Sequence, residues 1–482
     1  MNRLRTLLTP ATTVSGFLFC ALFGVALTTG GCPLVPMPTD NSNSNDNSAN
    51  NNSANQNTND NSDKGDSGLT GQFIGSERCS ICHNNIHNDW TQTLHGRALE
   101  TLEEIGQAEN SACLPCHVVG FGESGGFVDR ATTNSLAGVG CEACHGPSRA
   151  HAENVNDESL RPPKNIASEV CGMCHTGSHH PNFDDWQESG HAEVVAEVAP
   201  RFEMGESLNA CGTCHSGDFF YRSILNTETL SDDFLMDVAP EDQHAVECAI
   251  CHDPHRRTGN APTPEDGRDF QLRYPEVANP TPTNTIDAAT DSKRFNLCGQ
   301  CHHSRGRTWD SGSRAPHHSN QANVYVGEMP LPDEESTPLV LSRVSVHSFA
   351  VEQCATCHMY RQDFQDEQAP AISGHTFRVN ENSCATSGCH PSMAQAEAVK
   401  NTLQMEVQAR LDSILTRLGD PATWQYSSDG GPADQSTVSD RVKQARFLYY
   451  YTLNDGSLGI HNPAYVRDML EKAEELLTAE GL

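Results

Sequence analysis

Cysteine and histidine are the residues most able to do chemistry in this 482-residue sequence, which holds 20 Cys and 23 His. Eighteen of the cysteines form nine pairs, and a histidine directly follows each pair. Eight pairs have two residues between their cysteines, and the ninth has four. The nine motifs are Cys79/Cys82/His83, Cys113/Cys116/His117, Cys141/Cys144/His145, Cys171/Cys174/His175, Cys211/Cys214/His215, Cys248/Cys251/His252, Cys298/Cys301/His302, Cys354/Cys357/His358 and Cys384/Cys389/His390.

This spacing is typical of covalent haem c attachment. The two thiols add to the two haem vinyl groups, and the histidine that follows binds the iron as its proximal ligand. Zinc sites also use paired cysteines, but they do not require a histidine after every pair. Disulfides across two residues are strained and usually catalytic. We therefore predict nine haems c, with thioether bonds at all 18 cysteines and the nine motif histidines as proximal ligands.

The other fourteen histidines are enough to give every iron a second, distal ligand. Trp90 is followed five residues later by His95, and Trp186 by His191, which indicates an internal repeat of one haem module. In such a module the Trp could pack on a porphyrin edge while the His reaches a neighbouring iron. The candidate distal ligands are His95, His151, His191, His244, His255, His318, His347, His375 and His461.

The composition limits how these sites can be positioned. Hydrophobic residues make up 36% and aromatic residues 6% of the chain, which is low for a packed core of this length. Large apolar groups such as haem could fill the interior instead. The formal net charge of −32 argues against a nucleic-acid partner, because phosphate would be repelled. That charge favours solubility, or the steering of a basic redox partner.

The first 70 residues predict export and a tether. Residues 1–32 have a positive start followed by an apolar run, Gly16–Leu27, that is too short for a confident membrane span. The run ends in Thr29-Gly30-Gly31-Cys32, which resembles a lipobox with Cys32 as the acylated residue; plain cleavage is the alternative. Residues 33–70 are rich in Asn, Ser and Asp, and we predict a disordered tether that holds the protein off a membrane.

The rest of the chain divides into a haem body, 71–391, and a C-terminal region, 392–482. Turn residues are frequent in the body, where we expect short helices to carry the motifs. Apolar periodicity predicts longer helices over Ala394–Leu418, Val438–Leu453 and Pro463–Leu477, the last with Asn462 as its N-cap. The predicted fold class is mainly α with extensive irregular chain, stacked haems and a C-terminal helical region.

Several segments resemble the multihaem cytochromes that include hydroxylamine oxidoreductase, its tetrahaem acceptor, octahaem tetrathionate reductase and pentahaem nitrite reductase. The segments are Gly140–His151, Cys248–His255, Ala315–Gln321, His347 before Cys354, Gly374–Phe377 before Cys384, and Asp455–Pro463. Ser148 stands where Gly is usual in this family. The resemblance covers about Gly71 to Leu482, and it implies haems stacked in close pairs with helices at the C-terminus.

Two functions remain open from the sequence. The first is electron transfer in the periplasm or cell envelope, by a lipid-anchored protein that serves redox proteins or a quinol-linked membrane complex. The second is an oxidoreductase for a small nitrogen or sulfur compound at one open-site haem, with Arg256, Arg257, His179 and His180 as possible substrate contacts. All nine motifs end in histidine, whereas the family's nitrite reductases use lysine at the catalytic haem. We expect Tyr449, Tyr450 and Tyr451 to be packing aromatics, and no catalytic side chain is assigned.

Overall fold

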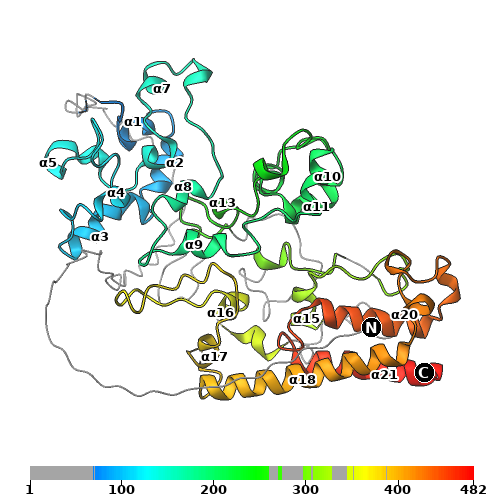
Figure 1. Ribbon diagram of the computed structural model, residues 1–482. Helices are drawn as coiled ribbons and strands as arrows, with labels where there is room; N and C mark the ends of the chain where they lie inside the picture. The colour runs from blue at the N-terminus through cyan, green and yellow to red at the C-terminus, as the bar shows by residue number, and fades with distance from the viewer. Residues whose placement is uncertain are drawn as a thin grey trace, which may run out of the picture. The chain divides into compact units, whose positions relative to one another are not determined.

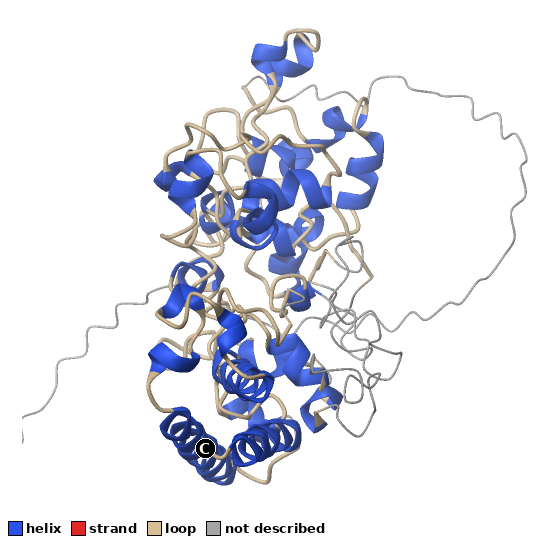
Figure 2. Ribbon diagram, turned by 90° about the vertical axis from the view of Figure 1, so that its right-hand side faces the viewer, coloured by secondary structure: helices blue, strands red, loops and turns tan. Residues whose placement is uncertain are grey.

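The computed structural model describes residues 69, 71–259, 270–273, 297–305, 308–327, 345–350, 352–386 and 388–482. The predicted export segment with Cys32, and all of the predicted tether except Leu69, lie outside these residues. The described residues belong to one compact unit, Cys32–Leu482. Their regular structure is helical, apart from four isolated β-bridges (Figures 1 and 2). The predicted fold class, mainly α with much irregular chain, is confirmed.

The helices of the body are short, and eight of the sixteen described α-helices overlap an attachment motif. The α-helices are α1 (Ser76–Ser80), α2 (Asn84–Trp90), α3 (Ala98–Glu104), α4 (Leu114–His117), α5 (Arg130–Thr133), α6 (Cys141–His145), α7 (Arg149–Glu153), α8 (Glu169–Gly172), α9 (Asn182–Gln187), α10 (Ala199–Glu203), α11 (Leu208–His215), α12 (Gly217–Phe219), α13 (Cys248–Cys251), α15 (Gln321–Val326), α16 (Cys354–His358) and α17 (Asn382–Thr386). Single 3₁₀ or π turns are η1 (His95–Arg97), η2 (Asn134–Leu136), η3 (Glu158–Leu160), η4 (Phe220–Leu225), η5 (Pro240–Asp242) and η7 (Val346–Phe349).

The internal repeat predicted from the two Trp–His pairs is present in the structure. The Trp90 indole N–H donates to the carbonyl of Val139 at 3.1 Å, and that of Trp186 donates to Val246 at 3.0 Å. In each case the accepting residue lies two positions before an attachment cysteine. Its own N–H donates to the carbonyl of His95 or of His191. Each Trp therefore ties its module to the next attachment motif through the backbone.

In each repeat, a buried glutamate side chain accepts hydrogen bonds from backbone N–H groups, one of which belongs to a serine. Glu142 accepts hydrogen bonds from the backbone N–H groups of Ile74, Gly75 and Ser148. Glu247 accepts from the N–H of Ser168 at 2.9 Å and of Ala245 at 3.1 Å. These carboxylates satisfy donors that would otherwise be buried without a partner. They hold the chain where side-chain packing alone is sparse.

The C-terminal region forms the largest apolar core of the described chain. Its helices are α18 (Met393–Leu418), α19 (Pro421–Trp424), α20 (Asp440–Asn454) and α21 (Pro463–Glu480), with turns η8 (Ser427–Asp429) and η9 (Gln435–Thr437). Helices α18, α20 and α21 pack together, as Figure 1 shows. Tyr451 is fully buried in their core, and Tyr449 joins the same cluster, which supports their reading as packing aromatics.

The predicted start of the last helix is confirmed in its details. The Asn462 side chain accepts a hydrogen bond from the N–H of Tyr465 at 3.3 Å, and Pro463 occupies the first helical position. Asn462 also donates to the carbonyl of Val324 at 3.0 Å, which ties the helix start to the haem body. In the described part of the chain, no helix has the length and apolar character needed to cross a membrane.

Candidate haem sites

Attachment cysteines of different motifs lie next to one another, and these contacts join the motifs into a continuous series whose order differs from their order in the sequence. We name each motif by its histidine. Sulfur atoms of neighbouring motifs lie close enough to interact in five pairs: Cys79–Cys141, Cys116–Cys174, Cys171–Cys248, Cys214–Cys301 and Cys298–Cys354. Electrostatic contacts complete the series by joining Cys144 to Cys171 and Cys174, Cys251 to Cys298, and Cys357 to Cys384 and Cys389.

These contacts define a single path through the described chain. It runs through the motifs of His83, His145, His175, His252, His302, His358 and His390 in that order. The His117 motif branches from the His175 motif, and the His215 motif branches from the His302 motif. The two branching motifs occupy equivalent places in the two copies of the internal repeat.

Three attachment cysteines are exposed in the protein chain by itself: Cys144, Cys389 and Cys82. The neighbouring Ile81 and His83 are exposed as well. The thioether bonds of these cysteines to haem stay a prediction.

Six of the nine motif histidines face a second histidine at a nearly constant distance. The ring centroids are 6.0 Å apart for His175–His95, 6.1 Å for His145–His255, His302–His191 and His215–His317, and 6.2 Å for His252–His375 and His358–His461. Two nitrogens that each lie about 2 Å from one metal, on rings whose centres are about 1 Å further out, would give about 6 Å. The donor set therefore fits an iron held between each pair.

Hydrogen bonds at Nδ1 orient several of these rings and leave Nε2 free. The Nδ1 atoms of four motif histidines bond to backbone carbonyls: His117 to Ala98 (2.8 Å), His145 to Pro163 (2.9 Å), His252 to Phe270 (2.6 Å) and His358 to Phe377 (2.9 Å). Among the facing histidines, Nδ1 of His317 contacts the hydroxyl of Ser319 at 2.9 Å, and Nδ1 of His375 contacts that of Ser373 at 3.0 Å. Such outer contacts fix the tautomer and the orientation of a metal-binding imidazole.

Burial keeps most of these imidazoles neutral, which is the form that binds a metal. Burial is the largest cause in each case, and it lowers the pKa of His95, His191 and His317 to about 4 and that of His375 to about 3. Neighbouring histidines lower these pKa values further. His461 differs, because its pKa is raised: burial lowers it, but the adjacent Asp455 raises it by more.

The candidate distal set differs from the structure at His318. The structure places His317, its neighbour, opposite His215, while His318 is exposed and stacks on His317 with ring centres 4.3 Å apart. The sequence carried a signal for this choice, because Ser319 follows His317 at the spacing that lets its hydroxyl contact Nδ1. The structure therefore favours His317 over the predicted His318 as the ligand opposite His215, and the choice between the two stays a prediction.

Three other candidates have no motif histidine at this ring spacing in the described chain. His347 is the most similar of the three to a paired histidine. Burial lowers its pKa most, and the nearby motif histidine His390 lowers it further. Its Nδ1 bonds to the carbonyl of Ile460 at 2.8 Å. His244 contacts the carboxylate of Asp218 at 2.9 Å. His151 has a buried Nδ1 that makes no hydrogen bond in the described structure.

His83 and His117 also face no histidine ring at the 6 Å spacing among the described residues. His180, which was not in the candidate distal set, has its ring centre 6.2 Å from that of His175 and is in electrostatic contact with both His175 and His117. Its neighbour His179 packs on Phe364 with ring centres 3.8 Å apart, and both of its ring nitrogens are buried without a hydrogen-bond partner. His179 follows His175 at the spacing at which His87 follows His83, so the repeat could have drawn attention to this segment.

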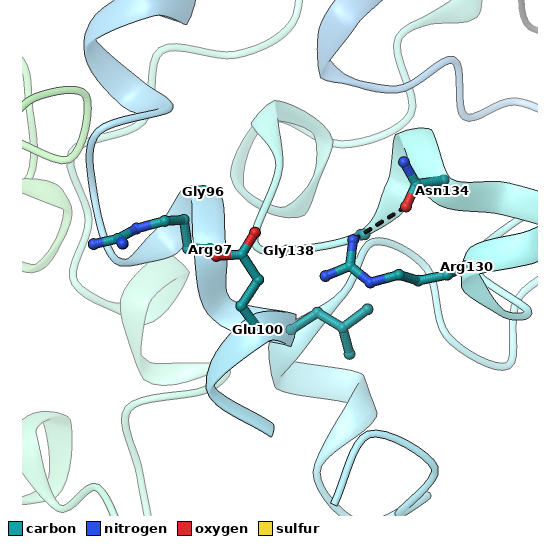
Figure 3. A pocket seen from close by; sticks show the side chains of 8 residues that line it. Gly96, Arg97, Glu100, Arg130, Asn134 and Gly138 are labelled. Atoms are coloured by element: carbon teal, nitrogen blue, oxygen red, sulfur yellow. Dashed lines mark hydrogen bonds between the residues drawn. The ribbon is translucent and has the colours of Figure 1, made fainter. Parts of the chain in front are cut away.

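The cations near the sites are mostly engaged with protein groups. Arg256, considered as a substrate contact, donates to Asp253 at 3.0 Å, and Arg273 pairs with the same carboxylate at 3.4 Å. Figure 3 shows a small pocket lined by Glu100 and Arg130, while the Arg97 side chain at its edge points away from them. Arg130 there bonds to Asn134 at 3.1 Å and forms an ion pair with Glu103.

Part of the chain is similar in sequence to known proteins. The family described as cytochrome c554 and c-prime matches residues 78–146. Cytochrome c-554 of Nitrosomonas europaea (strain ATCC 19718 / CIP 103999 / KCTC 2705 / NBRC 14298) is 36% identical over 92 residues, which is 16% of this chain and 39% of that protein. The chain thus spans well under half the length of this curated relative.

Two solved structures share the fold over most of the chain. The outer cell wall cytochrome OcwA aligns with a TM-score of 0.55 and 18% identity, covering 84% of this chain and all of that one. The undecahaem cytochrome from the S-layer of Carboxydothermus ferrireducens aligns with a TM-score of 0.55 and 21% identity, covering 85% of this chain and 70% of that one. The chain therefore shares the fold of these two cytochromes, and its residues 78–146 match the family described as cytochrome c554 and c-prime.

Proposed function

We propose that this chain is an exported cytochrome that holds nine c-type haems and transfers electrons between redox partners outside the cytoplasm. The observation that carries this proposal is the set of six histidine pairs with ring centres 6.0–6.2 Å apart. When bound, haem c supplies a reversible one-electron iron couple whose potential depends on the axial ligands and on burial.

The chain's own residues would perform three tasks in this function. The cysteine pairs would fix each haem by two thioether bonds. A histidine on either side of the iron would exclude substrate from it, and this also limits the structural change on reduction. The continuous series of motifs from His83 to His390 would bring neighbouring haems close enough for electrons to pass along the chain. No acidic or basic side chain has to donate or accept a proton.

The sequence and the names of the relatives support a site of action outside the cytoplasm. The predicted export segment, the lipobox at Cys32 and the polar tether support a protein held at the cell envelope by a lipid anchor. The names of the two structural relatives refer to an outer cell wall and to an S-layer. The net charge of −32 favours basic redox partners, and a quinol-linked membrane complex is a second possible electron source.

A haem count and a ligand-binding experiment test this proposal. The pyridine haemochrome assay on the purified protein should give nine haems per chain. Carbon monoxide added to the dithionite-reduced protein should leave the spectrum almost unchanged, because histidine occupies both axial positions of the irons. A count well below nine, or carbon monoxide binding by most of the haems, would refute the proposal.

One observation favours the alternative of an oxidoreductase for a small nitrogen or sulfur compound. In the described chain, His83, His117 and His390 have no histidine ring opposite them at the 6 Å spacing. An iron bound there with one protein ligand could accept a substrate. Carbon monoxide binding by one or two haems of nine, together with spectral changes on adding nitrite or hydroxylamine, would favour this alternative.

A further inference from the structure

The acceptor at Nδ1 differs among the paired histidines, and one of them has a carboxylate. Backbone carbonyls accept from His145, His252 and His358, and neutral hydroxyls contact His317 and His375. His461, which faces His358, instead places Nδ1 2.6 Å from Oδ1 of Asp455. A charged acceptor makes the shorter and stronger hydrogen bond, and so draws the imidazole proton further from the ring.

The Asp455 carboxylate is buried and held in place. Its side chain is 0% exposed, and it lies just after helix α20. Its second oxygen, Oδ2, accepts from the hydroxyl of Ser457, and the same hydroxyl accepts the backbone N–H of His461 at 3.1 Å. Asp455 and Ser457 together fix both the ring and the backbone of His461. In the described residues, no lysine or arginine forms an ion pair with Asp455.

The other carboxylate beside a paired histidine lacks these properties. Asp253 lies 3.8 Å from Nδ1 of His255, too far for a hydrogen bond, and its charge is offset by Arg256 and Arg273. The Asp218–His244 contact involves a histidine that faces no motif histidine at the 6 Å spacing in the described chain. Asp455 therefore presents a buried, uncompensated negative charge to one site.

We propose that Asp455 is a positioning residue that lowers the midpoint potential of the haem attached at Cys354 and Cys357. The carboxylate strengthens electron donation from His461 through its hydrogen bond, and its negative charge in a medium of low dielectric favours the ferric over the ferrous state. Both effects act in the same direction. This proposal rests on the proposed function, because it requires His461 and His358 to hold one iron.

The position of this site in the series determines how the lowered potential would affect electron transfer. Cys354 contacts Cys298 of the His302 motif, and Cys357 lies near Cys384 and Cys389 of the His390 motif. The site therefore lies between the rest of the series and its last member. A low potential there makes each electron that enters or leaves through the His390 motif pass an uphill step, which would slow exchange at that end.

A redox titration of the Asp455→Asn variant tests the proposal. The amide keeps the shape and an acceptor but removes the charge, so one haem's share of the absorbance change should move to higher potential while the rest stays in place. Asp468→Asn makes the same charge change at an exposed site on α21, and Ser373→Ala removes the neutral partner of His375. Both controls should leave the lowest-potential component where it is.

Several outcomes separate this proposal from the proposed function. An unchanged titration in Asp455→Asn, with all haems present and low-spin, would overturn the role of Asp455 and leave electron transfer standing. A new high-spin haem would show that Asp455 only holds His461 in place. If the variant fails to incorporate its haems, Ser457→Ala supplies the second test, because it frees the carboxylate to turn away from His461. The same component should then shift upward by a smaller amount, and no shift would overturn the proposal.

Discussion

At the residue scale, the attachment motifs could be read from the sequence but the histidine pairs could not. A cysteine pair and the histidine after it act through local chain geometry. A distal ligand comes from elsewhere in the chain: His95 faces His175, and His461 faces His358. Such pairs depend on how the modules dock, which no local pattern contains. The Trp–His repeat was informative because the same contact between modules occurs at both Trp residues.

The choice between His317 and His318 gives a prediction at this scale. His317 faces His215 at 6.1 Å, whereas His318 is exposed. His317→Ala should therefore convert one haem from low-spin to high-spin in the oxidised protein, as measured by electron paramagnetic resonance. His318→Ala is the matched control and should leave the spectrum unchanged. The opposite result would show that the sequence-based choice of His318 was right.

At the element scale, the C-terminal helices were predictable and the supports of the haem body were not. The apolar periodicity of α18, α20 and α21 placed each helix within three residues of its observed ends. Glu142 and Glu247 serve similar purposes in the two repeats, yet one follows its attachment cysteine and the other precedes it. Their role depends on backbone N–H groups that come together only in the folded chain, so no sequence pattern revealed it.

Removing one of these carboxylates gives the prediction at the scale of an element. Glu142→Ala would leave three buried N–H groups without an acceptor, at a cost of about 3 kcal/mol or more in the free energy of unfolding. Glu153→Ala, which removes an exposed acid paired with Arg149 at 3.5 Å, should cost less than about 1 kcal/mol. Thermal unfolding followed by circular dichroism should show a clear drop in midpoint for the first variant alone. Equal midpoints would contradict the role assigned to Glu142.

At the scale of the whole molecule, the mainly helical fold could be predicted from the motifs and from the low apolar content. The path through the motifs could not be predicted, because it follows from contacts between cysteines far apart in sequence, such as Cys79 and Cys141. Haem must supply much of the core of the body, since the described apolar core is concentrated in the C-terminal helices. We therefore expect the body to fold only as its haems are attached.

The predicted anchor can be tested on the complete protein. Cys32→Ala removes the proposed acylation site, so the cytochrome should move from the membrane fraction to the soluble fraction of the exporting cell. Haem staining of the fractions measures this directly, and the haem content per chain should not change. If the wild-type protein is already soluble, plain cleavage of the export segment replaces the lipid anchor.

The central claim is that histidine pairs hold most of the irons, so that the protein conducts electrons rather than transforming a substrate. Electron paramagnetic resonance of the oxidised, purified protein, with spins quantified against the haem content, tests this claim most directly. The account predicts low-spin signals for nearly all of nine haems, without a change on adding nitrite or hydroxylamine. A strong high-spin signal that either compound alters would contradict it and assign the protein to catalysis at that iron.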